Sequence, residues 1–351
     1  MVKNNIWLGM LAMVLVFGMM VVGCDDGSAN DNGKEENNNG KEEVDNTITW
    51  TYATNNPFGS SSISSIVYGA GKFVAGGHDG KMAYSIDGIS WAAINSPFSA
   101  NNYSIAITYG DGKFVAIGST LTGSDMVTTS TDGIVWTTAV GSSALNNTFT
   151  YDIAYGGGKF VTGRRNMAYS TDGQTWMTAT NNAFDSFPYA QFHCIVYGNG
   201  KFVAGGNSGS AKGILGYSTD GEIWLPITDN TNNTINNKGV ISGIAYGNGK
   251  FVAYVDGSFG GGMMYSEDGI TWTDANVSNI YGYTFGKNIG FGGNKFVAYD
   301  NGKTLYSTDG ITWNYISSTG GGSVIAYGGT HNSERFVAGI YLALMYSNIQ
   351  N

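Results

Sequence analysis

A unit of about 44 residues recurs seven times along the chain, and this repeat constrains the fold more than any local motif does. Each unit begins with an apolar segment that ends in Tyr-Gly or a variant of it, and a segment of the type Gly-Lys-Phe-Val-Ala follows. The basic residue of this second segment stands at Lys72, Lys113, Lys159, Lys201, Lys250, Lys295 and Arg335. The intervals between these positions run from 40 to 49 residues, so the units are predicted to be copies of one structure.

Each unit offers four short strands, as the first unit shows. Residues 64–68, 72–76, 82–85 and 89–93 are rich in β-branched or aromatic side chains and are bounded by Gly, Asp or Asn. Turns such as Ala70-Gly71 and Ile86-Asp87-Gly88 are predicted hairpin loops, in which the glycine supplies the positive φ that three- and four-residue hairpins need. No unit has a 3.6-residue apolar period, which excludes a helical solenoid. Seven four-stranded antiparallel meanders of similar size predict an all-β fold, a seven-bladed β-propeller.

The two ends of the chain complement each other. The seventh unit has candidate strands at 324–327, 335–338 and 344–347, and then the chain stops before a fourth. The missing strand is present at the start, because Thr47-Ile48-Thr49-Trp50 matches Gly310-Ile311-Thr312-Trp313 of the sixth unit. We therefore predict that the N-terminal strand completes the last blade, which closes the ring and removes open sheet edges.

A third element ends each of the first six units and reads Ser-x-Asp-Gly-x-x-Trp. Its aspartates are Asp87, Asp132, Asp172, Asp220, Asp268 and Asp309, and its tryptophans are Trp91, Trp136, Trp176, Trp224, Trp272 and Trp313. The element resembles the Asp-box, or BNR repeat, of the sialidase-like propellers, although here the glycine directly follows the aspartate. The resemblance implies a folding element on a turn away from any ligand site.

Physical chemistry agrees with that role for the aspartates. Asp and Ser in a tight turn accept backbone N–H bonds, and Trp covers the turn with apolar surface. The alternative, a ring of carboxylates that binds Ca²⁺, needs several oxygens per ion, and one carboxylate per unit fits that poorly.

The first 24 residues have the pattern of a secretory signal. Lys3 gives a positive start, residues 6–22 are uncharged and mostly apolar, and a small residue precedes Cys24. The sequence Val21-Val22-Gly23-Cys24 resembles the lipobox of bacterial lipoproteins, although Leu is commoner than Val at its first position. The resemblance implies that residues 1–23 are a lipoprotein signal peptide and that Cys24 is lipidated. The alternative is an uncleaved membrane anchor, because 17 residues is near the lower limit for a span.

Residues 24–45 form a segment of a different composition. It contains eight acidic residues and two lysines but no aromatic residue, so it is predicted to be a disordered acidic tether. The propeller domain is then predicted to span residues 46–351. The whole chain has a formal charge of −9 and a pI near 4.7, which argues against a nucleic-acid partner.

The connections between strands are expected on two faces of the ring, because antiparallel strands reverse direction at each turn. The first–second and third–fourth turns, which we call the turn face, are regular in every unit. The second–third and fourth–first connections, which we call the loop face, vary in length and content. Function usually belongs to variable loops on a rigid scaffold. The candidate binding residues on the loop face are therefore His78, Asp79, Asp125, Arg164, Arg165, Phe187, Tyr189, Asp256, Phe259, Tyr281, Tyr283, Asp300 and Tyr341.

Other recurrent residues are expected to serve the fold. The repeated Lys and Arg residues are predicted to be packing stems or turn partners, not a basic patch. Phe58, Phe98 and Phe184 follow variants of one Asn-containing pattern, which favours packing. Two cysteines cannot form a disulfide framework, and Cys194 is predicted to be a buried, inert thiol.

An enzymatic function is not predicted. The sialidase resemblance would imply an arginine triad, a Tyr–Glu pair and an acid/base Asp, on six blades. This chain has three arginines, of which two are adjacent and Arg335 holds the repeat's lysine position. A glycosidase of another kind would need two carboxylates across a cleft. The loop-face aspartates are numerous enough to supply such a pair, so this alternative stays open. The three histidines are isolated, and no helix follows the glycine-rich turns, so neither a metal nor a phosphate cofactor is predicted.

Seven-bladed BNR-like propellers also include lipidated assembly factors of the photosystem II type. They resemble this chain in size and blade number, but their basic patch is absent here. We predict a monomeric lipoprotein of the bacterial cell envelope, anchored to a membrane by its lipid, with the outer membrane or cell surface favoured. Its propeller is expected to bind a protein partner. The alternative is a glycan-binding lectin, since Tyr and Asn share the same loops, and a glycoside hydrolase ranks third.

Overall fold

The structure is a computed structural model in which the chain divides into two units, Met1–Val44 and Asp45–Asn351. It describes residues 48–100, 102–120, 125–139, 143–145, 150–163, 166–182, 189–209, 212–227, 239–256, 261–277, 289–300, 302–319, 322–330, 333–340 and 342–348. The predicted signal peptide, Cys24 and the predicted tether lie outside the described residues. Among those described, no helix is both long and apolar enough to cross a membrane.

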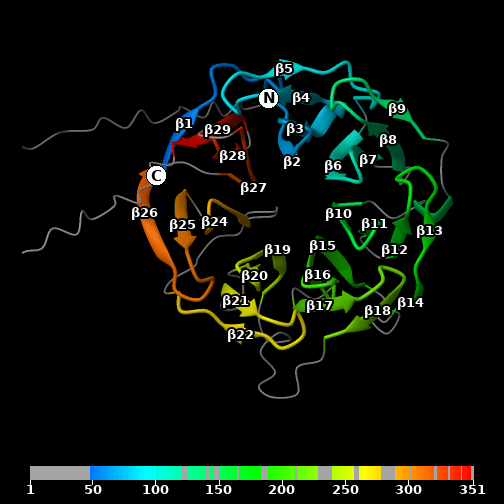
Figure 1. Cartoon of the computed structure of the whole chain (residues 1–351), viewed down its shortest axis with the longest axis vertical. Helices are drawn as coiled ribbons and strands as arrows, with labels where there is room; N and C mark the ends of the chain where they lie inside the picture. Colours follow the sequence, from blue (N-terminus) through cyan, green and yellow to red (C-terminus); the bar gives the residue numbers. More distant parts are fainter. Residues whose placement is uncertain are drawn as a thin grey trace, which may run out of the picture. The chain divides into compact units, whose positions relative to one another are not determined.

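The second unit contains seven sheets, each with four antiparallel strands, which we number as blades in chain order (Figure 1). Blade 1 contains β2 (Ile63–Gly69), β3 (Lys72–Gly77), β4 (Met82–Ser85) and β5 (Ala92–Ala93). Blade 2 contains β6 (Asn102–Gly110), β7 (Lys113–Thr120), β8 (Asp125–Ser130) and β9 (Thr137–Thr138). Blade 3 contains β10 (Asp152–Gly156), β11 (Lys159–Gly163), β12 (Met167–Ser170) and β13 (Met177–Thr178).

Blades 4 to 6 repeat the pattern, and blade 4 gains a fifth, parallel strand. Blade 4 contains β15 (Gln191–Gly198), β16 (Lys201–Asn207), β17 (Gly213–Ser218) and β18 (Ile223–Pro226), with β14 (Thr180–Asn182) beside β18. Blade 5 contains β19 (Ile241–Gly247), β20 (Lys250–Val255), β21 (Gly262–Ser266) and β22 (Thr273–Asp274). Blade 6 contains β23 (Ile289–Gly292), β24 (Lys295–Asp300), β25 (Lys303–Ser307) and β26 (Asn314–Thr319). Two 3-10 turns, η1 (His78–Gly80) and η2 (Ser143–Leu145), are the helical elements of the described part.

Blade 7 joins the two ends of the propeller, as predicted. It contains β27 (Val324–Gly328), β28 (Arg335–Ile340), β29 (Ala343–Asn348) and, as its outer strand, β1 (Thr49–Tyr52). Strand β1 runs antiparallel to β29, and Trp50 lies opposite Ser347. The first strands of successive blades contact each other all the way around, including β27 with β2, so the ring is closed (Figure 1).

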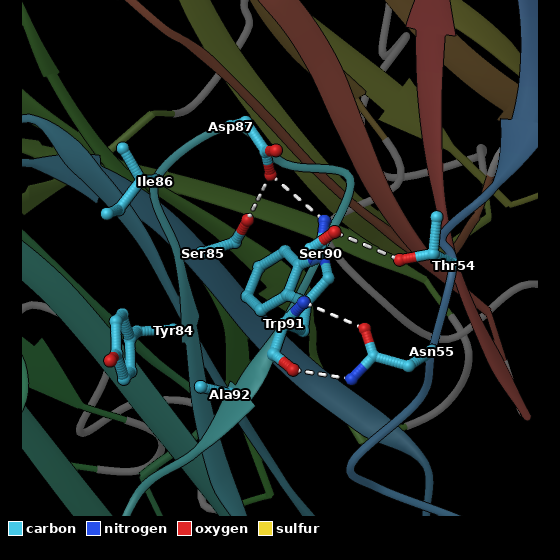
Figure 2. Close-up of a pocket in the computed structure, with 9 residues that line it drawn as sticks. All are labelled: Thr54, Asn55, Tyr84, Ser85, Ile86, Asp87, Ser90, Trp91 and Ala92. Atoms are coloured by element: carbon cyan, nitrogen blue, oxygen red, sulfur yellow. Dashed lines mark hydrogen bonds between the residues drawn. The ribbon is translucent and has the colours of Figure 1, made fainter.

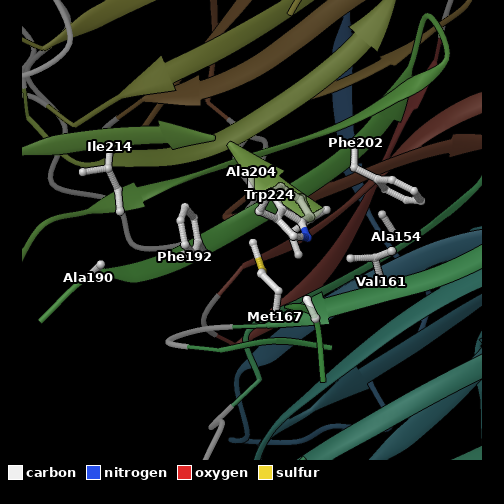
Figure 3. Packing of buried hydrophobic residues seen from close by; sticks show 11 residues of the cluster. Ala154, Val161, Met167, Ala190, Phe192, Phe202, Ala204, Ile214 and Trp224 are labelled. Carbon is white, nitrogen blue, oxygen red and sulfur yellow. The ribbon is translucent and has the colours of Figure 1, made fainter. Parts of the chain in front are cut away.

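The hydrophobic core lies between the blades. Seven clusters of buried side chains each join a pair of neighbouring blades. In the cluster between blades 3 and 4, Val161 and Met167 pack with Phe192, Phe202 and Trp224 (Figure 3). Full burial of one such side chain stabilises the fold by about 1.5–3 kcal/mol, so each interface contributes to holding its two blades together.

A glycine–aromatic contact marks each blade interface near the turn face. The last residue of the first strand in each blade is a glycine, and a Cβ added there would overlap an aromatic ring of the next blade. The pairs are Gly69–Tyr109, Gly110–Tyr155, Gly156–Tyr197, Gly198–Tyr246, Gly247–Phe291, Gly292–Tyr327 and Gly328–Tyr68. The recurrent Tyr-Gly of the sequence is therefore a contact between blades, and the seventh pair closes the ring.

Two details differ from the predicted strands. The first–second hairpin of blade 1 is a two-residue turn in which both Ala70 and Gly71 have positive φ, as type I′ turns require. The predicted fourth strand at 89–93 is wrong in its first half, because only Ala92–Ala93 forms the strand. Residues 89–91 belong to a turn whose backbone N–H groups bond a side chain instead of a neighbouring strand.

Candidate functional site

The Ser-x-Asp-Gly-x-x-Trp turn of each of the first six blades, which we call its box, is held by the side chain of its aspartate, as blade 1 shows (Figure 2). Asp87 Oδ1 accepts hydrogen bonds from the N–H groups of Ile89 and Ser90, at 2.8 and 2.9 Å, and from the Ser85 hydroxyl at 2.9 Å. Ser85 Oγ in turn accepts the N–H of Gly88 at 2.8 Å. One carboxylate and one hydroxyl thus satisfy three backbone donors of a turn that has no strand partner.

The same hydrogen bonds recur in all six boxes. These hydrogen bonds lower the pKa of each aspartate carboxyl. For Asp172, burial raises the pKa, but bonds from the N–H groups of Thr175 and Gln174 and from the Ser170 hydroxyl outweigh it and lower the pKa to about 2. The pKa of each of the other five aspartates is also lowered. A carboxylate held ionised in this way is a poor proton donor near neutral pH.

The repeated basic residues connect these turns between blades. Lys72 Nζ, in blade 1, donates to the Asp132 carbonyl oxygen in the box of blade 2 at 2.7 Å. Lys201 Nζ donates in the same way to the Asp268 carbonyl at 2.6 Å. The lysines therefore bond a turn of the next blade, one of the two roles predicted for them.

A shallow pocket of about 430 Å³ lies at the box of blade 1 (Figure 2). Its walls include Tyr84, Asp87 and Trp91 of blade 1 and Thr54 and Asn55 of the segment that follows β1. The Asn55 amide bonds both the N–H and the carbonyl oxygen of Trp91, at 2.9 and 2.5 Å. The polar groups of this pocket mainly bond one another.

The two kinds of loop-face connection lie together, as predicted. In blade 1, the Asp79 carboxylate of the β3–β4 connection accepts the hydroxyl of Ser61, which precedes β2, at 2.6 Å. In blade 2, the Asp125 carboxylate accepts the hydroxyl of Thr150, which precedes β10, at 3.1 Å. Each carboxylate thus links one connection to another.

The other described loop-face candidates divide into buried and exposed residues. Asp256 and Asp300 are buried, and Asp300 accepts the Tyr254 hydroxyl at 2.8 Å. His78 is half-buried, and burial lowers the pKa of its imidazole against the raising effect of Asp79. Tyr189 is 65% exposed.

The remaining candidates cannot be placed with this group. They lie outside the described residues and are Arg164, Arg165, Phe187, Phe259, Tyr281, Tyr283 and Tyr341. Within the described part, no three His, Cys, Asp or Glu side chains are grouped so that they could hold a metal ion. Cys194 is buried, with its sulfur against the backbone oxygens of Gly205 and Ile241.

Sequence reasoning missed two polar residues with structural roles. Asn55 caps the edge of blade 1, and the signal for it was present, since the same Asn-containing pattern recurs before blades 2 and 4. Asp152 is a buried carboxylate of β10 that accepts the N–H of Ile195 in the next blade at 2.9 Å. In other blades the same position of the repeat holds Ser65 and Cys194, so the pattern did not predict a carboxylate there.

Fold and turn geometry together define a seven-bladed β-propeller whose Ser-x-Asp-Gly-x-x-Trp turns are held by their own serine and aspartate side chains. No family model matches the sequence, and no curated protein matches it. Similar solved structures include YCF48 bound to a D1 peptide, at 13% identity over 87% of this chain and 97% of that chain, with a TM-score of 0.64. YCF48 from Cyanidioschyzon merolae is 16% identical over 86% of this chain and 100% of that chain, with a TM-score of 0.62. A streptogramin B lyase is 12% identical over 86% of this chain and 98% of that chain, with a TM-score of 0.64. At these identities the likeness establishes the fold.

Proposed function

We propose that this chain is a lipoprotein of the bacterial cell envelope whose propeller binds a protein partner through the loop face. The observation that carries the proposal is the exposed Tyr189 between blades 3 and 4. Its Cβ and carbonyl lie against Gly209 of the β16–β17 connection, where an added Cβ would collide with them. The Tyr189 backbone packs against Gly209 while its ring is 65% exposed, and aromatic rings are the type of side chain enriched at the energetic centres of protein interfaces.

The carboxylates of the loop face support binding over catalysis. The Asp79, Asp125 and Asp300 side chains each accept a hydroxyl from the protein itself. A glycosidase needs two carboxyl groups that face each other across a substrate, and these three serve separate connections of blades 1, 2 and 6. Among the solved propellers, YCF48 binds a D1 peptide, which supports the idea that such a ring serves as a receptor for another protein.

A crosslinking experiment tests the proposed face. A photoreactive amino acid is placed at position 189 in the full-length protein in cells, and the matched control carries it at position 52, where the tyrosine is 63% exposed. We expect one protein adduct from position 189 and none from position 52. The adduct must re-form with the purified partner, and Tyr189→Ala should weaken that binding by roughly tenfold or more. Equal adducts from both positions, or equal binding by Tyr189→Ala and Tyr52→Ala, would contradict the proposal.

A glycan ligand remains the second candidate, because an exposed tyrosine ring is also a surface on which a sugar can stack. A glycan array probed with the full-length protein separates the two. Binding to one glycan that Tyr189→Ala abolishes and Tyr52→Ala preserves would replace the protein partner by a sugar.

The membrane anchor is proposed from the Val-Val-Gly-Cys24 sequence. Cells grown with a radiolabelled lipid precursor should label the original protein and not the Cys24→Ser variant. The Cys194→Ser variant is the matched control, because its sulfur is buried in the propeller and should not affect labelling. Continued labelling of Cys24→Ser would refute the anchor.

A further inference from the structure

The outer edges of three blades are covered by the chain itself. In blade 6, the N–H of Asn276 donates to the Ile311 carbonyl at 2.8 Å, and the N–H of Trp313 donates to the Asn276 carbonyl. In blade 4, β14 runs parallel to β18 and pairs with the same positions of the box. In blade 1, Thr54 and Asn55 bond the matching groups. In each case the covering segment comes from the end of the preceding blade.

Among the described residues nothing covers blade 2 in this way, although residues 94–100 of the linker before it are described. The matching groups are the carbonyl oxygen of Ile134 and the N–H of Trp136, and neither bonds any residue that the structure describes. Asn95, which matches Asn55 in the preceding linker, is exposed and forms no hydrogen bond in the described part. Val135 is 70% exposed, and Trp136 is half-buried, whereas the other five box tryptophans are buried. Blade 2 therefore presents a short strand edge that no described residue pairs.

A depression of about 300 Å³ adjoins this edge. Its lining includes Lys113, Thr129, Val135 and Thr137 of blade 2 and Gln174 of blade 3. Thr129 directly precedes the box serine, and in the six other blades the residue at that position is a tyrosine. These tyrosines are Tyr84, Tyr169, Tyr217, Tyr265, Tyr306 and Tyr346. Blade 2 thus combines an open edge with a small side chain at the position where the other six blades have a tyrosine ring.

Blade 3 shows what the ring does at that position. Tyr169 lies opposite Val161 and Met177, as Thr129 lies opposite Val115 and Thr137 in blade 2. The Lys159 ammonium lies 5.4 Å from the centre of the Tyr169 ring, within cation–π distance. Lys113 is the equivalent of Lys159 and borders the depression in blade 2.

We propose that the edge of blade 2 binds an extended peptide segment of a partner protein, with one aromatic side chain of that segment in the depression beside Thr129. The segment would run parallel to residues 134–136, like the covering segments of blades 4 and 6, and bond the Ile134 carbonyl and the Trp136 N–H. Its ring would lie beneath Lys113, as Tyr169 lies beneath Lys159. A peptide fits because the edge offers a backbone donor and a backbone acceptor at strand spacing, which another strand complements. This site is on the rim of the ring and does not depend on the loop-face proposal.

The test uses the full-length protein in detergent and a blocked, fluorescent heptapeptide with one central tyrosine among threonines and asparagines. We expect anisotropy to report binding, and Thr129→Tyr to weaken it by roughly tenfold or more, because this variant fills the depression as the other six blades do. The matched control is Thr138→Tyr, which places the same ring on the opposite face of β9 and should change affinity by no more than about twofold. A peptide with alanine for the tyrosine should bind as weakly to the original protein as the tyrosine peptide binds to Thr129→Tyr.

Hydrogen exchange provides a second readout that does not depend on the variant. The peptide should slow exchange within residues 131–139 of the original protein and leave the boxes of blades 1 and 6 unchanged. Equal affinity of the three proteins, protection elsewhere, or no binding at millimolar peptide would overturn the proposal. Concentration-dependent dimers that Thr129→Tyr abolishes would also overturn it, because the occupant would then be a second copy of this chain.

Discussion

The turn face and the loop face of the ring differ in how their residues interact. On the turn face, each of the six boxes uses the same serine and aspartate atoms, and each blade contacts the next through the same glycine and ring. On the loop face, the contacts differ from one connection to the next, as Ser61 with Asp79 and Thr150 with Asp125 show. The difference shows that the repeated residues build the ring, and that sequence on the loop face is free to vary.

The comparison also explains the composition. Low charge and abundant glycine reflect a scaffold in which many residues serve turns and blade interfaces. The box carboxylates and most of the described repeat lysines bond backbone groups, so their charges are used within the protein. A partner is therefore expected where the repeat is broken, either on the loop face or at the edge of blade 2.

The largest expected effect comes from opening the ring. Deletion of residues 47–54 removes β1 together with the buried Ile48 and exposes the edge of β29. We expect the melting temperature to fall by roughly 10 °C or more, with aggregation, since about 1 kcal/mol corresponds to 2–4 °C in a large domain. Thermal unfolding followed by circular dichroism provides the measurement.

A permuted chain is the control for that deletion. Residues 47–54 are moved behind residue 351 through a short turn, which restores β1 beside β29 as a hairpin. Recovery of the original melting temperature would show that the strand itself closes the ring. An unchanged melting temperature in the deletion variant would contradict the closure.

A smaller effect is expected from one glycine on each face. Gly156→Ala places a Cβ against the Tyr197 ring at the turn-face end of β10, and we expect a loss of about 1–3 kcal/mol in the free energy of unfolding. Gly262→Ala is at the loop-face end of β21, where a Cβ has no neighbour within 4 Å, and should stay within about 0.5 kcal/mol. Urea denaturation measures both. Equal losses of unfolding free energy in the two variants would contradict the difference in packing between the two faces.

A double-mutant cycle sharpens the cause. If the ring contact is responsible, Gly156→Ala should cost less in a Tyr197→Ala background than in the original protein. Additive losses would point to backbone strain at residue 156 instead.

The repeat made the fold predictable. Spacing and turn residues were enough for the blade count, the antiparallel order and the closing strand, because each unit repeats the same hydrogen-bonding requirements. The fourth strand was overestimated because the pattern Ile-Ser-Trp has strand-forming residues, while the Asp87 carboxylate competes for their backbone N–H groups.

The roles of the loop-face candidates were less predictable for a physical reason. The place of a residue in a connection does not indicate whether its carboxylate is buried, as that of Asp300 is, or bonded by a neighbour, as that of Asp79 is. The open edge of blade 2 did leave a signal in the sequence, since Thr129 replaces a repeated tyrosine. That signal points to an open edge only because Asn95 forms no hydrogen bond in the described part, which the structure shows and the sequence does not.

The smallest expected effect is the acid response of a single box. The pKa of Asp172 is lowered to about 2 from the ordinary aspartate value of 3.8, so its carboxylate stabilises the fold above pH 4. That stabilisation is lost as the pH falls from about 4 towards 2, because the unfolded chain binds the proton first. Asp172→Asn should lower the free energy of unfolding at pH 7 by about 1 kcal/mol, a modest value because the carboxylate is largely solvated.

The difference between Asp172→Asn and the original protein should shrink through that pH window and vanish near its lower end, as urea denaturation at several pH values will show. The matched loop-face variant is Asp79→Asn, which keeps a residue suited to the positive φ at this position and should change stability by no more than about 0.5 kcal/mol at pH 7. A pH-independent loss in Asp172→Asn would mean that shape and not charge holds the box. A larger loss in Asp79→Asn than in Asp172→Asn would reverse the assignment of the scaffold to the turn face.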